Sequence, residues 1–160
     1  MVGLGQAARN DLACEPTSRV FSLNWNLPPY EITSPEDVKY NCVAWAAGRA
    51  EVRRRWWPAP SPFYYWPVEP REETVVGFVR AFVHLGYTVC DTSDLEPNYE
   101  KLAIYADSTN TPSHMARQLS SGHWTSKLGE LEDIQHLTLD QLSGSDYGRV
   151  VQILKRKRPT

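Results

Sequence analysis

The hydrophobic pattern of this chain changes period near Gly86, and this change limits the possible folds most strongly. Before it, the apolar residues between Val75 and Val83 recur at helical spacing, and Gly86 fits a helix C-cap. After it, short apolar runs alternate with turn-rich segments. We predict strands over residues 87–90, 101–106, 114–119, 124–128 and 147–154, and a short helix over 137–142. Helices followed by antiparallel strands predict an α+β domain, with N-terminal helices packed on an antiparallel sheet.

The length predicts a single domain. A chain of 160 residues is a usual size for one domain and long enough to bury a full hydrophobic core. We divide it into an irregular segment over residues 1–33, a core over 34–154 and a basic tail over 155–160. The Lys155-Arg156-Lys157-Arg158 run in that tail is predicted to be solvated rather than bound to phosphate.

Two helix starts precede the change of period. Ser34-Pro35-Glu36-Asp37 combines an N-cap residue, a first-turn proline and acidic residues. Asn41 offers a second N-cap directly before Cys42. We predict either one bent helix or a short turn followed by a helix from Cys42 to about Arg55, buried on most sides.

An aromatic, proline-rich stretch over residues 56–67 interrupts the regular elements. Its prolines forbid a regular helix and disfavour a central strand, so we predict an extended loop. Its aromatic rings either complete the core or line a substrate cleft. Tyr64, Tyr65 and Trp66 are the candidates for the cleft, together with Trp45 from the preceding helix.

Composition excludes several classes of function. The net charge of −2 gives no electrostatic argument for nucleic acid or membrane binding. Neither a signal peptide nor a membrane-spanning run is visible, which favours a cytoplasmic location. Three cysteines at irregular spacing, without a CxxC pair, predict reduced thiols and no zinc site. The four histidines, even with Asp133 or Glu132, lack the spacing of a metal site, and no cofactor is expected.

Cys42 and His114 together suggest catalysis by a cysteine nucleophile and a histidine base. A thiol at a helix N-terminus is stabilised as the thiolate by the helix dipole. The backbone N–H of Cys42, with the Asn41 amide, can hold an oxyanion, and a strand histidine such as His114 can accept and return a proton. Alternatively, Cys42 is a small buried hydrophobe and His114 a structural histidine.

The third catalytic residue depends on the register of the hairpin after His114. If the chain turns at Ser121-Gly122, Thr125 and Lys127 share the face of His114. Neither accepts a hydrogen bond from an imidazole well. Asp133, just past the strand, is the better orienting group, although it could instead cap the next turn. His136 and Lys127 remain alternatives, and Ser126-Lys127 is a weaker candidate for a serine–lysine pair.

The order of these segments resembles that of a known enzyme group. Tyr40-Asn41-Cys42-Val43-Ala44-Trp45-Ala46, then Lys101-Leu102-Ala103-Ile104-Tyr105-Ala106 and His114-Met115-Ala116, resemble NlpC/P60 and related papain-like cysteine hydrolases over about residues 38–154. The segment from His114 to Gly129 also resembles an uncharacterised bacterial family of this type. The chain differs from NlpC/P60 in lacking an Asp before the cysteine and in carrying the aromatic insert.

The resemblance implies a papain-like fold and hydrolysis of a peptide or protein amide through a thioester, by a peptidase, amidase or protein deamidase. Cys42 would be the nucleophile, His114 the base, and Asp133 the orienting residue. A transglutaminase or acyltransferase would use the same site. The alternative from another class is a non-catalytic binding module on the same scaffold that uses loop 56–67. The sequence does not indicate the oligomeric state.

Overall fold

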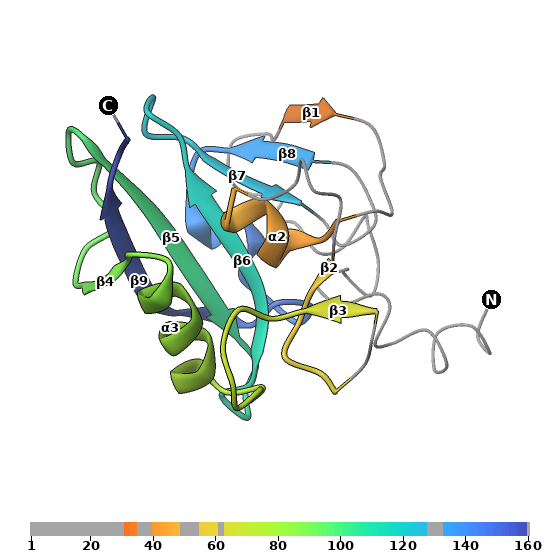
Figure 1. Ribbon diagram of the computed structural model, residues 1–160. Coiled ribbons are helices and arrows are strands. Elements are labelled where there is room, and N and C mark those ends of the chain that lie inside the picture. The colour runs from red at the N-terminus through yellow and green to blue at the C-terminus, as the bar shows by residue number, and fades with distance from the viewer. Residues whose placement is uncertain (1–30, 35–39, 49–54, 61–62, 128–132, 160) are drawn as a thin grey trace.

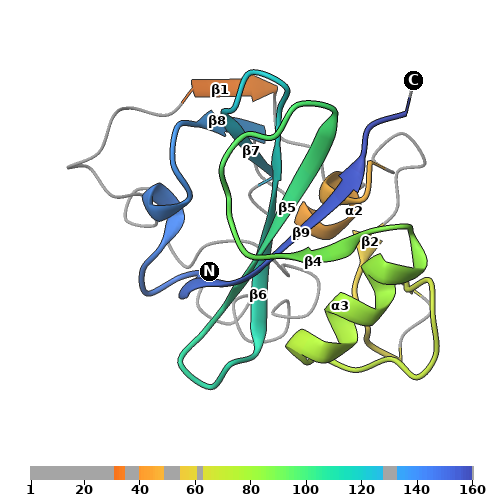
Figure 2. The same cartoon turned by 90° about the vertical axis from the view of Figure 1, so that its left-hand side faces the viewer.

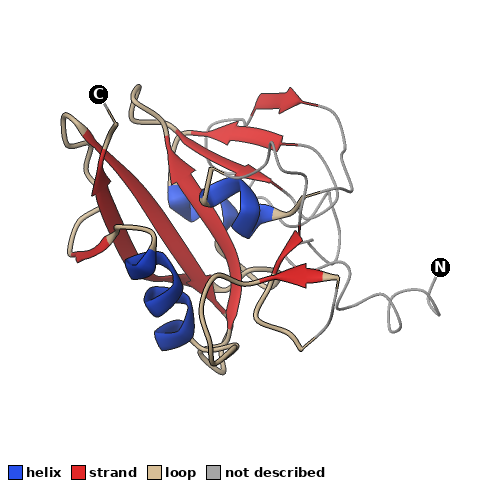
Figure 3. Cartoon of the chain, in the orientation of Figure 1, coloured by secondary structure: helices blue, strands red, loops and turns tan. Residues whose placement is uncertain are grey.

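The computed structural model describes residues 31–34, 40–48, 55–60, 63–127 and 133–159. The elements are β1 (Glu31–Ser34), α2 (Cys42–Ala46), β2 (Arg55–Trp56), β3 (Tyr64–Tyr65), α3 (Val75–His84), β4 (Thr88–Cys90), β5 (Tyr99–Ala106), β6 (Pro112–Gln118), β7 (Trp124–Lys127), β8 (Asp133–His136), the 3-10 helix η2 (Leu139–Leu142) and β9 (Arg149–Lys157). The predicted α+β class is confirmed, with few helices and a mostly antiparallel sheet (Figures 1 and 3).

The main sheet of the described residues has the strand order β1-β8-β7-β6-β5-β9-β4, and every neighbouring pair is antiparallel. The short strands β2 and β3 form a separate parallel pair. Figure 2 shows α2 and α3 on one side of the sheet and the blue segment that contains η2 on the other. We call these sides the helix face and the η2 face.

Side-chain alternation along the strands divides the core between these two faces. On the helix face, Ile104 and Met115 pack with α2 and α3. On the η2 face, Tyr105, Trp124 and Tyr147 belong to a second apolar cluster. Because neighbouring residues of a strand point to opposite faces, each position in the central strands belongs to one cluster or the other.

Helix α3 forms where its spacing predicted it. The Thr74 side chain caps its N-terminus by accepting from Gly77 N–H at 2.9 Å. At the other end Gly86 has φ +99°, and its N–H donates to Val83 O at 3.0 Å, which confirms the predicted C-cap. The helix buries Phe78 and Phe82 against the sheet.

Helix α2 is shorter than predicted. It ends at Ala46, Gly48 has φ +71°, and Arg55 already lies in β2. The prediction of one helix to about Arg55 is therefore wrong, because the left-handed glycine ends the α-helical hydrogen bonding. The predicted helix start at Ser34 is also wrong at that residue, since Ser34 ends β1. Residues 35–37 lie outside the described residues.

The folded region extends beyond both ends of the predicted core, which covered residues 34–154. Residues 31–33 belong to β1 rather than to an irregular segment. Strand β9 continues to Lys157, so residues 155–157 are not a solvated tail. Lys155 pairs with Glu96 at 2.9 Å, and Arg156 pairs with Glu100. These opposite charges on the neighbouring segments keep the basic run within the sheet.

The hairpin between β6 and β7 differs in register by one residue from the expected one. Arg117 pairs with Thr125, and Gln118 pairs with Trp124. Leu119 N–H donates to His123 O at 2.8 Å, so the loop contains three residues and ends at Gly122, which has φ +96°. A shift of one residue exchanges the two faces for every later side chain. Thr125 and Lys127 therefore do not share the face of His114.

Candidate functional site

Asn41 caps α2, and its side-chain amide also bonds to the backbone of Trp56. Its Oδ1 accepts from the backbone N–H groups of Ala44 and Trp56, both at 3.2 Å. Its Nδ2 donates to Trp56 O at 2.9 Å. The predicted N-cap is confirmed, and the same side chain also joins α2 to β2. Because all these bonds are internal and buried, the geometry gives Asn41 a structural role.

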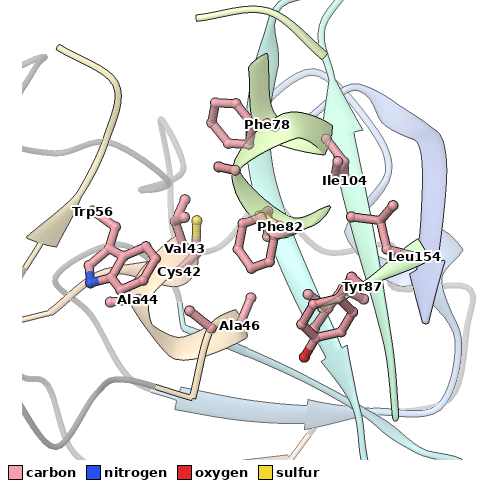
Figure 4. Packing of buried hydrophobic residues seen from close by; sticks show 14 of the residues in the cluster. Cys42, Val43, Ala44, Ala46, Trp56, Phe78, Phe82, Tyr87, Ile104 and Leu154 are labelled. Atoms are coloured by element: carbon pink, nitrogen blue, oxygen red, sulfur yellow. The ribbon is translucent and has the colours of Figure 1, made fainter. Parts of the chain in front are cut away.

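Cys42 begins α2, but its sulfur is neither exposed nor a free thiol. The residue is 0% exposed and packs in the helix-face cluster with Ile104 and Met115. Figure 4 shows the sulfur among the apolar side chains of this cluster. Cys42 is disulfide-bonded, and its partner lies outside the described residues. The prediction of a reduced thiol is therefore wrong for Cys42. Cys90 is free and buried, and Cys14 lies outside the described residues.

His114 lies on the opposite face of the sheet from Cys42. It pairs with Tyr105 across β5 and β6, whereas the next pair, Ile104 with Met115, belongs to the cluster around Cys42. The imidazole stacks on Tyr147 with ring centroids 4.1 Å apart, and meets the Tyr105 ring edge-on at 5.3 Å. The structure therefore does not bring the predicted nucleophile and base together, because the sheet separates their side chains.

The surroundings of His114 favour its neutral form. The residue is fully buried, and within the described residues neither ring nitrogen has a hydrogen-bond partner. Burial lowers the pKa of His114 well below its usual value, and the nearby His136 lowers this pKa further. Such an imidazole is a weak base at neutral pH. The aromatic stack gives it a packing role on the η2 face.

His136 is held by one buried and one partly buried hydrogen bond that the sequence did not predict. Its Nδ1 lies 2.9 Å from Thr138 O, which can only accept, so Nδ1 carries the hydrogen. Nε2 then accepts from the Ser126 hydroxyl at 2.9 Å. Burial lowers the pKa of His136 to about 4. With the correct hairpin register, Ser126 falls on the η2 face, as His136 does, so the register was the missing signal.

Lys127, another candidate for the third residue, is separated from His114 by the sheet. Lys127 lies on the helix face, with Nζ 5.1 Å from the centre of the Tyr40 ring. Ser126 and Lys127 point to opposite faces and form no serine–lysine pair. Asp133 lies inside a strand rather than just past one, since it opens β8 opposite Lys127. The side chain of Asp133 lies outside the described residues.

Most rings of the aromatic loop complete the core, which is one of the two predicted alternatives. Trp56, Tyr64 and Trp66 are 3%, 5% and 4% exposed. Trp66 contacts Phe78 of α3 with ring centroids 5.0 Å apart, and Tyr65, half-buried, meets Trp56 at 4.8 Å. These contacts give the rings a packing role on the helix face.

Trp45 is half-buried on the helix face. It stacks on Tyr40, with ring centroids 6.1 Å apart, and the Arg117 guanidinium lies 4.4 Å from its ring centre. These contacts connect α2 to the sheet through a cation–π interaction.

Two cavities lie away from both Cys42 and His114. The first, of about 530 Å³, lies on the η2 face, and neither residue lines it. Its lining residues are Asp91, Ser93, Asp94, Leu95, Gln118, Gly122, Trp124, Leu137, Thr138, Leu139, Asp140, Val150 and Ile153. We call it the η2-face cavity. A second, of about 440 Å³, lies at the C-terminal end of α2 between Arg117 and Arg156. The sequence could not indicate the first cavity, because separate segments form it.

The family of the chain is shown by one comparison. The model of DUF7689, described as a domain of unknown function, matches residues 31–155. The chain belongs to the DUF7689 family. No curated protein and no solved structure matches the chain. The DUF7689 region extends from β1 into β9, so it contains Cys42, His114 and every residue that lines the η2-face cavity.

Two further observations on the DUF7689 domain concern membranes and metals. None of the described helices is long and apolar enough to cross a membrane. Within the same described part of the chain, no three side chains of His, Cys, Asp or Glu come together as a possible metal-ligand set.

Proposed function

We propose that this DUF7689 domain is a non-catalytic binding module whose ligand occupies the η2-face cavity. The observation that carries this proposal is the buried amide of Gln118 at the cavity wall. Gln118 is 2% exposed, and its Oε1 has no hydrogen-bond partner within the described residues. Its Nε2 donates to Ser93 O at 3.0 Å, and Ser93 also lines the cavity.

An unpartnered buried acceptor has a free-energy cost of about 1–3 kcal/mol. Because Oε1 itself is buried, a ligand donates to it only after the Gln118 side chain turns towards the cavity, and that contact is then favourable. The rest of the wall combines apolar side chains with a few polar groups, which is the usual composition of a ligand site. Trp124 is 3% exposed and forms a rigid part of this wall.

The position of the two predicted catalytic residues also favours binding over thiol catalysis. A base must lie within hydrogen-bond reach of the nucleophile, directly or through one water. Cys42 and His114 lie on opposite faces of the sheet, and the Cys42 sulfur is in a disulfide.

A papain-like, NlpC/P60-like cysteine hydrolase is the second candidate. One observation favours it: Cys42 is the first residue of a helix packed on an antiparallel sheet. This function requires a reduced Cys42 and a base from the helix face in place of His114. With an amine as acceptor, the same thioester chemistry would make the enzyme a transglutaminase or acyltransferase.

Site-resolved alkylation separates these two candidates. Wild-type protein and His114→Ala are treated with iodoacetamide across a pH series, with and without reductant, and each cysteine is followed by mass spectrometry. A binding module should leave Cys42 unmodified while the protein is folded, in both proteins. The proposal is overturned if reduced Cys42 reacts well below pH 8.5 and faster than Cys90, whether or not His114 is replaced, because the second candidate takes its base from the helix face.

Binding itself is measured on ¹⁵N-labelled protein with three probes of equal length: pentylammonium, 1-pentanol and pentanoate. At least one probe should shift the side-chain amide resonances of Gln118 at millimolar concentration. If none of them does, the η2-face cavity is not a ligand site.

A further inference from the structure

We infer that the ligand of the η2-face cavity is an organic cation, an alkylammonium or guanidinium group on an apolar stem. This inference rests on the proposed binding function and specifies the ligand class of the same cavity.

The charged residues that line the cavity are all acidic. They are Asp91, Asp94 and Asp140, and all three are exposed. The lining contains no lysine, arginine or histidine. Within the described part of the chain, none of these three carboxylates takes part in an ion pair. Carboxylates of like charge around one cavity favour a cation and repel an anion.

Two lysines near residues 91–95 and one arginine near Gln118 are engaged elsewhere. Arg158 lies 3.7 Å from Glu100 and donates to Gln118 O at 3.4 Å. Lys101 donates to Thr92 O at 2.9 Å, and its Nζ lies 3.7 Å from Glu96. Lys155 pairs with the same Glu96 at 2.9 Å. These lysines are therefore held by Glu96, and the aspartates at the cavity remain available for a ligand.

The uncharged groups of the cavity also match a cation with N–H donors. The unpartnered Oε1 of Gln118 can accept one hydrogen bond, and an ammonium or guanidinium donates several. Leu95, Leu139, Val150 and Ile153 form apolar parts of the lining, which an alkyl stem would cover.

This wall suits an organic cation better than a bare metal ion. A metal ion needs several converging oxygen, nitrogen or sulfur ligands. The described residues contain no such group of three His, Cys, Asp or Glu side chains. The aspartates border the cavity without converging on one point, so they attract positive charge on a larger molecule.

The three probes of equal length test the charge requirement. Titration of ¹⁵N-labelled wild type, followed at the Gln118 side-chain amide, should give at least tenfold tighter binding for pentylammonium than for 1-pentanol, and the weakest binding for pentanoate. If 1-pentanol binds as tightly as pentylammonium, or pentanoate binds best, the cation inference fails while the binding proposal stands. If no probe binds, both fail.

Charge-neutral variants test whether the cavity aspartates cause the preference for pentylammonium. Asp91→Asn and Asp140→Asn should each weaken pentylammonium binding about threefold to tenfold and leave 1-pentanol binding unchanged. The matched control is Glu73→Gln, which removes one negative charge from an exposed residue outside the cavity and should leave pentylammonium binding unchanged. If Glu73→Gln weakens pentylammonium binding equally, or if neither aspartate variant weakens it, the cavity aspartates do not bind the cation and the inference fails. Circular dichroism checks that each variant is folded.

Two further probes identify the source of the cation. Nα-acetyl-lysine methylamide represents the basic side chain of a peptide, and spermidine represents a free polyamine. Tighter binding of the first than of pentylammonium assigns the cavity to a peptide, and tighter binding of spermidine assigns it to a small amine. Weaker binding of both than of 1-pentanol would contradict the inference.

Discussion

At the scale of single residues, Asn41 connects two elements. Its side chain caps α2 and also pairs with both backbone groups of Trp56. A cap contributes about 1 kcal/mol, and each buried backbone group left unpaired costs about 1–3 kcal/mol. Its role as an oxyanion donor stays a prediction, and the contacts that the structure shows are structural.

We therefore expect Asn41→Ala to lower the free energy of unfolding by at least about 3 kcal/mol. Asn41→Ser should cost less, because the hydroxyl still caps Ala44. Urea denaturation measures both. Thr74→Ala, which removes the single capping bond of α3, is the control and should cost only about 1 kcal/mol. Equal losses in Asn41→Ala and Thr74→Ala would show that the bonds to Trp56 contribute nothing.

The two buried histidines predict acid sensitivity. The pKa of His136 is lowered to about 4 and that of His114 lies well below 6.5, in both cases mainly through burial. Below pH 6.5 the unfolded chain binds more protons than the folded chain, so the free energy of unfolding falls as the pH falls from about 6.5 towards 4. The stability from each histidine is complete above pH 6.5 and is lost at about 1.4 kcal/mol per pH unit below it.

Urea denaturation between pH 7.5 and 4.5 measures this slope. His136→Gln should reduce the slope by about one proton's contribution, even though it also lowers stability at pH 7.5. His84→Gln removes an exposed histidine at the end of α3 and should leave the slope as in wild type. A slope unchanged in His136→Gln would contradict the burial argument.

At the scale of elements, the register of the β6–β7 hairpin decided most of the contacts that the sequence did not predict. A two-residue turn at Ser121-Gly122 and a three-residue turn ending at Gly122 fit the same residues equally well. The structure has the longer turn, so Ser126 rather than Lys127 lies on the η2 face. Turn length is decided by how β7 packs between β6 and β8, which local sequence does not encode.

The turn that leads into β9 gives an element-scale prediction. Gly144 and Gly148 donate to each other's carbonyl oxygens at 2.8 and 2.7 Å. Gly148 has φ +76°, and a Cβ there would lie 1.9 Å from Ala106 O. We expect Gly148→Ala to cost about 3 kcal/mol or more, because the turn and β5 cannot both keep their positions.

Gly144→Ala is the matched control for this turn. Gly144 also has a positive φ, of +151°, but a Cβ there meets nothing within 4 Å. The cost should be limited to backbone strain of about 1–2 kcal/mol. Thermal unfolding of both variants compares the two costs. Equal destabilisation would mean that contact with Ala106 does not restrict this turn.

At the scale of the whole molecule, the sheet separates two apolar clusters with different chemistry. The helix-face cluster contains the disulfide-bonded Cys42, and the η2-face cluster adjoins the buried histidines and the η2-face cavity. Any function that needs groups from both faces would require a rearrangement of the central strands.

The disulfide at Cys42 predicts a redox-dependent stability. Reduction should lower the free energy of unfolding by about 2–4 kcal/mol, because the cross-link no longer restricts the unfolded chain. Thermal unfolding with and without reductant measures this, and Cys42→Ala should abolish the difference. In unfolded but unreduced protein, iodoacetamide should modify Cys90 and leave Cys42 unmodified. Modification of Cys42 under those conditions would disprove the cross-link.

The sequence by itself determined the elements whose signals are local. Thr74 and Gly86 bound α3, and apolar runs between turn residues predicted β4 to β7 and β9, because capping and alternation act within a few residues. The α+β class followed from their order. Asn41 as an N-cap was found for the same reason.

Only the tertiary structure decided which side chains meet. Strand pairing sets the face of the sheet on which each side chain lies. The observed hairpin register differs by one residue from the predicted one, so Thr125 and Lys127 lie on the opposite face from His114. The separation of Cys42 from His114, the Ser126–His136 bond and the η2-face cavity depend on contacts between residues far apart in the chain. Such contacts are chosen by the packing of the whole core, since each local segment is compatible with more than one partner.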